Sequence, residues 1–240
     1  MTDTLIVVQA RMQSERLPGK ALAVLSGRPV LEWVVERVRA LPFSLLIATG
    51  DTAENKPIIE LADTLEIQVI RGPENDVMTR YGMALEAYPD TETIVRVTGD
   101  NPLTAPELIE TIVKNQKTNG ADYAFALKAP YGTSADAFKA STLRRLVEVA
   151  DAPRHREHIN TFILDNHLRF DITGVSIPKA LKRSDVRVTL DTADDFARLQ
   201  AIFGYIQDPI RADVLQIIEA YDQLPSQLKA SPFPADTSFL

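Results

Sequence analysis

The feature that most constrains the fold is a regular alternation of short, β-branched apolar runs with segments of helical periodicity. The run LIVV at 5–8 is followed by apolar residues at helical spacing between 30 and 41, and the next run begins at Leu45. Such near-continuous apolar runs are typical of strands covered by helices on both faces. We therefore predict an α/β fold with a doubly wound, mainly parallel, Rossmann-like sheet. The expected strands are Leu5–Val8, Leu45–Ala48, Ile67–Ile70, Thr93–Val97, Tyr123–Ala126 and Val186–Leu190.

Polar residues at the starts of the helical patterns predict where the helices begin. Asp51, Thr104 and Thr192 are each followed three residues later by an acid, which is the pattern of a capping box. Asp76 stands before another helical pattern and is expected to cap it. The two elements that flank the first helix complete a βαβ unit, with Pro29 placed for the helix's first turn.

The domain organisation follows from the length and from two breaks in the rhythm. At 240 residues one large domain is expected, over residues 1–224, with a tail at 225–240 that carries three prolines. The stretch 128–134 and the helical pattern Arg154–Asn166 are expected to form a small insertion over the active face. Residues 169–178 suggest a projecting hairpin, where a homodimer contact is conceivable.

The charge balance excludes several classes of protein. The chain has 26 Lys and Arg against 33 Asp and Glu, a net charge of −7, so we expect no nucleic-acid partner. There is no cysteine, which excludes disulfides and thiolate metal sites but leaves carboxylate sites for hard metals. No stretch approaches the roughly 20 apolar residues of a membrane span, and the N-terminal run is too short for a signal-peptide core. We expect a cytoplasmic protein with no membrane partner.

The segment QARMQSERLPGK, residues 9–20, carries the most functional information. It lies between the first strand and a helix, where open α/β sheets bind ligands. Arg11, Arg16 and Lys20 place three cations within ten residues of an acidic chain, and Pro18-Gly19 predicts a turn. Arg and Lys together suit a polyphosphate whose charge shifts onto a leaving pyrophosphate. The loop matches neither a Walker loop nor a dinucleotide fingerprint, and the alternative is a solvated charged loop.

Two aspartates are expected at the same edge of the sheet. Asp100 ends the run TIVRVTGD, and Asp191 ends VRVTLD just before the expected cap at Thr192. Because parallel strands bring their carboxyl ends to one edge, both carboxylates could share one pocket. Mg²⁺ binds through a few carboxylates, phosphate oxygens and retained waters, so two acids suffice. The alternatives are a turn-forming Asp100 and an Asp191 that only interacts with the helix dipole.

The loop resembles the Q-A-R-x-x-S-x-R-L-P-G-K signature of the cytidylyltransferases, within them the branch of spore coat polysaccharide biosynthesis protein F, related to the synthetases of CMP-sugars such as CMP-acylneuraminate and CMP-Kdo. The resemblance continues through ATGD at 48–51, RG at 71–72, DVMTRY at 76–81, RVTGDNPL at 96–103, REH at 156–158 and VTLDTADDF at 188–196. It covers most of residues 4–203. It implies a Rossmann-like nucleotidyltransferase that uses CTP, a sugar acceptor and Mg²⁺.

The resemblance also implies roles for individual residues. Arg11, Lys20 and Asp100 would be catalytic, and Asp100 with Asp191 would bind the metal. The acceptor sugar would contact Asp136, Arg156 and His158, of which Arg156 and His158 cannot both share one face with Glu157. A simple ion pair of Asp76 with Arg80 is the alternative to their role beside the nucleotide. The implied nucleotide-binding set is Gln9, Ala10, Arg11, Arg16, Lys20, Thr49, Arg71, Asp76 and Arg80, with backbone near Ala10, Thr49 and Arg71 framing the base.

One segment departs from the pattern of the branch. Where relatives usually show G-x-D-V-E-x-F, residues 132–138 read GTSADAF, with Ser134 and Asp136 in place of the two acids. This affects the prediction of the acceptor more than that of the nucleotide. A structural role for Asp136 is the alternative to a contact with sugar hydroxyls. We predict transfer of CMP from CTP to an acidic sugar or sugar phosphate for surface polysaccharide or glycan synthesis. The alternatives are another nucleoside triphosphate, or a homologue that binds nucleotide sugars without turnover.

Overall fold

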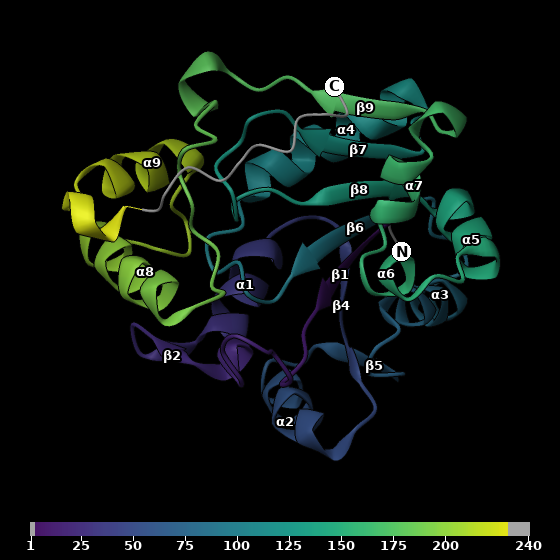
Figure 1. Ribbon diagram of the computed structural model, residues 1–240, viewed down its shortest axis with the longest axis horizontal. Helices are drawn as coiled ribbons and strands as arrows, with labels where there is room; N and C mark the ends of the chain where they lie inside the picture. Colours follow the sequence, from purple (N-terminus) through teal and green to yellow (C-terminus); the bar gives the residue numbers. More distant parts are fainter. Residues whose placement is uncertain (1–2, 230–240) are drawn as a thin grey trace.

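The apolar runs form the middle of one sheet in the computed structural model, which describes residues 3–229 (Figure 1). Within that range the strand order is β5-β4-β1-β6-β8-β7-β9. The strands are β1 (Thr4–Gln9), β4 (Ser44–Gly50), β5 (Gln68–Gly72), β6 (Thr93–Thr98), β7 (Tyr123–Ala126), β8 (Asp136–Lys139) and β9 (Ile172–Val175). A separate two-stranded ribbon consists of β2 (Val24–Leu25) and β3 (Arg28–Pro29).

The sheet is parallel except for β8, which runs antiparallel to both β6 and β7. The prediction of a doubly wound, mainly parallel α/β fold is confirmed. Alternate residues of β1 face opposite layers, so that Leu5 and Val7 belong to one buried cluster and Ile6 and Val8 to another. Burying both faces in this way explains why the strand has no polar alternation.

Helices cover both faces of this sheet. The side chains of α1 (Val30–Val38), α2 (Lys56–Thr64) and α4 (Pro106–Asn119) pack on one face, and those of α3 (Val77–Ala87) and α5 (Ala140–Val149) on the other. The C-terminal pair α8 (Ala193–Tyr205) and α9 (Val214–Asp222) lies side by side, away from α3 and α5 (Figure 1). Trp33 of α1 packs edge-on against Phe203 of α8, which ties this pair to the domain.

The predicted helix starts are confirmed in two of four places. Asp76 caps α3 by accepting a hydrogen bond from the backbone of Thr79, and Thr192 forms a full capping box with Asp195. The expectation is wrong at Asp51, because a short 3-10 turn intervenes and α2 begins only after Asn55. It is also wrong at Thr104, whose hydroxyl donates to the carbonyl of Asn101 while Pro106 starts α4.

Three further expectations are corrected. Residues 186–190 are extended but form no strand, since only Arg187 makes a bridge, to Tyr131. Residues 169–178 form no hairpin, because β9 pairs in parallel with β7 at the sheet edge. The helical pattern at 154–166 is two short helices, α6 (Pro153–Glu157) and α7 (Thr161–Asp165).

The described part of the C-terminal segment is docked. A turn at Ser226–Leu228 follows α9, and the carbonyl of Leu228 accepts a hydrogen bond of 2.7 Å from Arg198. Residues 230–240 of the expected tail lie outside the described range. Within residues 3–229 no helix combines the length and apolar character that a bilayer crossing requires.

Candidate active site

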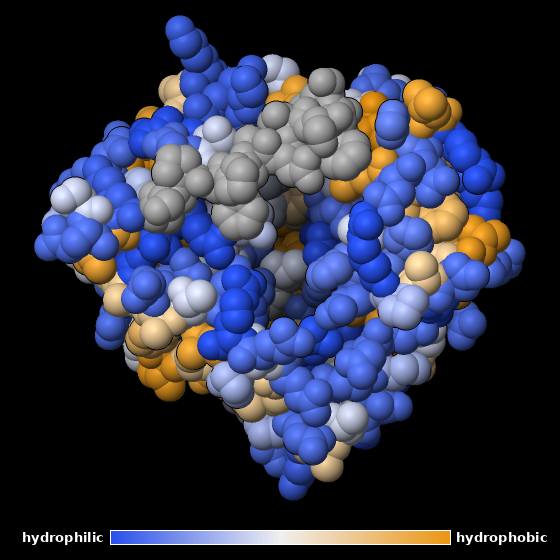
Figure 2. Space-filling model, in the orientation of Figure 1, coloured by the Kyte–Doolittle hydropathy of each residue, from blue (hydrophilic) through white to orange (hydrophobic). Residues whose placement is uncertain are grey.

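A cleft of about 540 Å³ lies at the carboxyl edge of β1 and β6. Its walls come from the loop 9–20, from the turn after β6, from the segment that ends at Asp191 and from the end of α6. Figure 2 shows the molecule hollowed near the centre of this face, with mostly hydrophilic residues around the hollow. The cleft therefore suits a polar ligand, in the place where open α/β sheets bind one.

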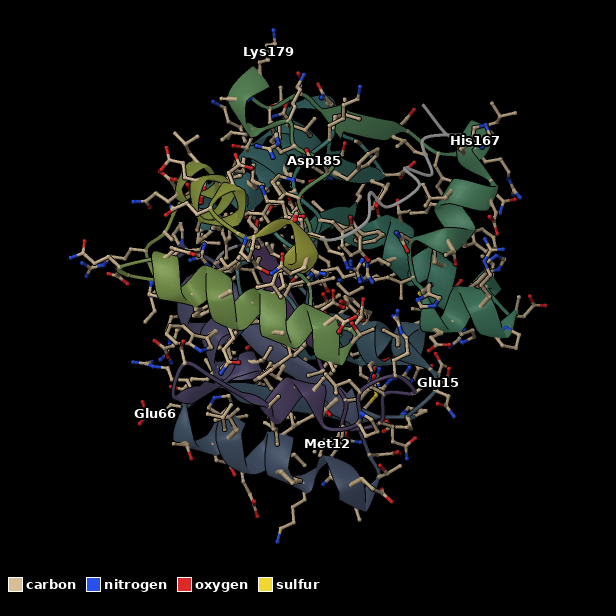
Figure 3. The ribbon with its side chains drawn as sticks, turned by 60° about the vertical axis from the view of Figure 1, so that its left-hand side comes forward. Met12, Glu15, Glu66, His167, Lys179 and Asp185 are labelled. Atoms are coloured by element: carbon tan, nitrogen blue, oxygen red, sulfur yellow. The ribbon has the colours of Figure 1, made fainter. Side chains whose placement is uncertain are left out.

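The loop after β1 has a defined shape. Gly19 adopts a left-handed conformation with φ of 73°, and its N–H donates to the carbonyl of Met12 to close the loop. The N–H of Met12 donates to the side chain of Asn55, which fastens the loop to the start of α2. Met12 and Glu15 mark this loop in Figure 3. The turn predicted at Pro18-Gly19 is present and leads directly to Lys20.

Lys20 lies between the two predicted metal ligands. Its Nζ is 2.5 Å from Asp100 Oδ2 and 2.9 Å from Asp191 Oδ1, so these oxygens are at most the sum of both distances apart, about 5.4 Å. Burial alone would lower the pKa of Lys20, but the charges of Asp100 and Asp191 outweigh it and raise that pKa. The sequence thus brings the two aspartates and a loop cation together at one point.

Asp191 lies next to Lys20 although the segment before it, residues 186–190, is not a β-strand. The N–H of Leu190 donates to the carbonyl of Asp100, which ties the extended segment to the turn after β6. Gly132, with φ of 98°, lets the loop before β8 approach the backbone of Thr189, where a Cβ would lie 2.7 Å from the nitrogen. The segment is therefore held by backbone contacts with two loops, a placement that strand patterning could not predict.

The other two loop cations are also paired with acids. Arg16 lies 3.1 Å from Asp191, whose second oxygen receives a hydrogen bond of 2.8 Å from Arg187. Arg11 donates across the cleft to Glu157, the last residue of α6, at 2.7 Å. Each cation that was predicted to bind phosphate therefore has a carboxylate partner within the described chain.

Two of the predicted site residues, Asp76 and Arg156, join neighbouring helices and do not line the cleft. Arg156 points to the other side of α6, where it donates to Asp76 Oδ2 at 2.8 Å, to the hydroxyl of Thr79 and to the carbonyls of Val147 and Ala150. Burial would raise the pKa of Asp76, but its bonds with Arg156 and Thr79 lower it. Both residues join α6 to α3 and support the site from outside, whereas His158, two positions after Arg156, does line the cleft.

The residues expected around the base lie partly inside the cleft. Gln9, Ala10 and Arg80 line it, and Arg80 is buried, with a pKa lowered by that burial. Thr49 is completely buried beside the cleft, and its hydroxyl has no partner among the described residues. Arg71 pairs with Thr49 in the sheet register, but its guanidinium is exposed and donates to the carbonyl of Asp51.

Asp136 belongs to a network beneath the cleft rather than to its wall. Its two oxygens accept from Arg96 at 2.7 Å and from the hydroxyl of Tyr123 at 2.9 Å. Arg96 also donates to Gln9 Oε1, and although burial alone would lower the pKa of Arg96, the charge of Asp136 raises it. The amide oxygen of Gln9 accepts from Tyr81 as well, which fixes the orientation of that side chain. Asp136 thus positions Arg96 and Gln9, both of which line the cleft.

Comparisons with known proteins show which family the chain belongs to. A family model described as cytidylyltransferase matches residues 5–224. This chain belongs to the cytidylyltransferase family. It is 35% identical to the uncharacterized protein MJ1063 of Methanocaldococcus jannaschii over 91% of this chain and 90% of that protein. It is 32% identical to the spore coat polysaccharide biosynthesis protein SpsF of Bacillus subtilis, over 85% and 87% of the two chains.

A solved cytidylyltransferase from Leptospira borgpetersenii has a closely similar fold. Its TM-score is 0.88 at 26% identity, with 97% of this chain and 99% of that chain covered. The present cytidylyltransferase is thus a nucleotidyltransferase with the fold that the sequence predicted.

The carboxylates of this cytidylyltransferase fit a hard divalent cation whose coordination would be completed by oxygens of a bound substrate. Within residues 3–229 no group of three or more His, Cys, Asp or Glu side chains converges as a metal site. Two carboxylates do converge, on Lys20, and two are enough for Mg²⁺ when phosphate oxygens and waters supply the rest. His155, three positions before the cleft residue His158, pairs with Asp165 at 2.9 Å.

Several cleft residues of the cytidylyltransferase were not identified from the sequence. Arg96 and Thr98 of β6, Tyr131 before β8 and Thr189 all line the cleft. For Arg96 a signal was present, because a single cation interrupts the apolar run TIVRV of a central strand. Tyr131 gave no comparable signal, since its position depends on the antiparallel course of β8.

Proposed function

We propose that this cytidylyltransferase transfers CMP from CTP to a sugar, either an acidic sugar or a sugar phosphate, and releases pyrophosphate. The observation that carries the proposal is the convergence of Arg11, Arg16 and Lys20 with Asp100 and Asp191 in one cleft. Three cations suit a triphosphate, and two edge carboxylates suit the cation that accompanies it. The relation to SpsF supports a sugar acceptor for surface polysaccharide or glycan synthesis.

In this proposal the loop cations exchange carboxylate partners for phosphate oxygens. An acceptor oxygen bonds to the α-phosphorus while the bond from that phosphorus to the bridging oxygen of pyrophosphate breaks. Arg11, Arg16 and Lys20 orient the triphosphate and stabilise the charge that builds up on the leaving pyrophosphate. Positioning and charge stabilisation suffice for such a transfer, so no nucleophilic side chain of the protein is required.

Asp100 and Asp191 are the proposed ligands of Mg²⁺. When bound, this cation would neutralise charge on the phosphates and polarise the reacting centre. Asp100 is held by the turn after β6, and Asp191 is held by Arg187 at 2.8 Å and by the helix cap that follows it. Their carboxylates are thus preorganised before the nucleotide arrives.

The two halves of the cleft suggest where the base and the acceptor bind. We place cytosine near the backbone of Ala10 and the ends of β4 and β5, where Thr49 and Arg71 lie opposite each other. We place the acceptor beside His158 and Arg96, on the side of β8. Asp136 would then act on the acceptor only through Arg96, and Arg156 only through the position of α6.

A pyrophosphate-release screen tests the proposal. CTP and Mg²⁺ are supplied with a panel of nonulosonic acids and sugar phosphates, and CTP, UTP, GTP and ATP are ranked by their effect on the melting temperature Tm. Release of pyrophosphate with CTP and one class of acceptor is expected, with CTP preferred to UTP because cytosine offers an amino donor where uracil offers a carbonyl acceptor. Equal shifts of Tm with CTP and UTP would refute cytosine as the recognised base. Release of pyrophosphate with GTP or ATP alone would refute CTP as the substrate.

A further inference from the structure

Glu157 is a cleft residue to which the proposed reaction assigns no role. Its side chain is 40% exposed and that of Arg11 is 33% exposed, and the two meet at 2.7 Å across the mouth of the cleft. Arg11 comes from the loop after β1 and Glu157 from the end of α6, 146 positions later. Their pairing therefore connects the phosphate-binding loop directly to the insertion.

The carboxylates that pair with the other two loop cations differ from Glu157, because they are the proposed ligands of a divalent cation. Arg16 and Lys20 are both held by Asp191, and Lys20 also by Asp100. When those cations turn to phosphate, a divalent cation can take their place between the aspartates. Glu157 has no such replacement, because within residues 3–229 the structure gives it no ion pair other than that with Arg11.

Glu157 also cannot withdraw with its helix. Arg156, the residue before it, donates to Asp76, to Thr79 and to two backbone carbonyls, which fixes the end of α6 against α3. The carboxylate can therefore leave Arg11 only by rotating its own side chain. It stays close to the cleft, where the charge of a bound polyphosphate repels it.

We propose that Glu157 is a positioning residue that holds Arg11 while the cleft contains no polyphosphate and competes with pyrophosphate for the Arg11 guanidinium. The inference rests on the proposed phosphate role of the loop and adds a function for α6. Glu157 weakens the binding of pyrophosphate, because binding must break the ion pair between Glu157 and Arg11. Binding also brings the negative charge of pyrophosphate near the Glu157 carboxylate, which then has no cationic partner. Release of the product is favoured for the same reason.

Titration of pyrophosphate at one fixed Mg²⁺ concentration tests the proposal. Glu157→Gln should lower the dissociation constant about threefold to fivefold, the size of effect expected for a partly exposed ion pair. The difference should shrink as salt is added, because the pair is accessible to solvent. Glu15→Gln is the matched control, since it removes the same charge from another cleft residue that has no role in holding Arg11, and it should change the constant by less than about 1.5-fold.

A double-mutant cycle separates competition for Arg11 from a general effect of charge. In an Arg11→Ala background, Glu157→Gln should tighten pyrophosphate binding by less than about 1.5-fold, because only the solvent-screened repulsion between the carboxylate and pyrophosphate remains. Unchanged or weaker binding by the single variant, an equal gain in Glu15→Gln, or an undiminished gain without Arg11 would each overturn the proposal alone. Failure of the unmodified protein and all variants to bind pyrophosphate would overturn it together with the phosphate role of the loop.

Discussion

Lys20 separates two carboxylates that would otherwise face each other, so Lys20→Met has a calculable consequence. The substitution keeps an unbranched side chain of similar length and removes its charge. Two like charges at most about 5.4 Å apart repel by at least about 3 kcal/mol at an effective dielectric constant of 20. Because both carboxylates can relax toward water, we expect about 1–2 kcal/mol of this repulsion to appear as lost stability.

Thermal unfolding measures the loss. For a chain of this size about 1 kcal/mol corresponds to about 2–4 °C, so Tm in a chelating buffer should fall by about 2–8 °C. Mg²⁺ without nucleotide should restore much of this in the variant, since it can replace the missing ammonium between Asp100 and Asp191. The unmodified protein should respond less, because Lys20 already occupies that place.

Lys56→Met is the control, because Lys56 is 75% exposed and, among residues 3–229, its one ion pair is with Glu60 on the same helix. It removes the same charge and should change neither Tm nor the response to Mg²⁺ appreciably. Equal Tm values for Lys20→Met and the unmodified protein in the chelating buffer would refute the electrostatic reasoning. A response to Mg²⁺ as large in the unmodified protein would refute competition between Lys20 and the metal.

Arg11→Ala should raise the dissociation constant for CTP at least about tenfold, because a charge-assisted hydrogen bond contributes about 1.5–3 kcal/mol, and an unchanged calorimetric titration would remove Arg11 from the site. Asp100→Asn keeps the shape but removes the charge, so pyrophosphate release should fall about 100-fold and recover partly with Mn²⁺, whereas full activity would exclude a metal-binding role. Burial opposes ionisation of Asp195, but Arg187 and Arg198 lower its pKa from 3.8 to about 2. The ionised carboxylate therefore stabilises the fold above about pH 4, and this stabilisation is lost as the pH falls through about 2. Asp195→Asn should lower the free energy of unfolding in urea by about 2 kcal/mol at pH 7 and by little at pH 2. An equal loss at both pH values would contradict this.

The sequence predicted the fold where local pattern and tertiary burial agree. The strand at Leu5–Val8 and the caps at Asp76 and Thr192 follow from apolar runs and capping side chains that the folded chain uses directly. The short antiparallel strand β8 was missed, because its sequence DAFK has no apolar run and its pairing depends on distant strands. Residues 186–190 have the composition of a strand but are held by loops instead.

Prediction of the site was best where residue chemistry and chain position coincide. Arg11 and Lys20 stand out as cations at a strand end in an acidic chain, and the structure brings both to the cleft. Arg156 and His158 are two positions apart, so helical geometry sends them in different directions, and only His158 reaches the cleft. The REH motif at 156–158 did not indicate which side of α6 faces the cleft. The contact of Arg11 with Glu157 joins residues 146 positions apart, beyond any local pattern.

The reversed direction of β8 leaves one loop unusually open to evolutionary change. A connection between parallel strands must cross the sheet and usually includes a helix, whereas β7 and β8 are antiparallel neighbours joined at the edge that contains the cleft. The side chains of the segment 127–135 can therefore change without shifting the register of β1, β4 and β5, provided that the backbone of residues 131–133 keeps its contacts with Ala105 and with residues 186–189. Variation there would alter the cleft wall around Tyr131 while the loop at 9–20 stayed intact. Under the proposed function, related chains could in this way bind different acceptors beside an unchanged nucleotide site.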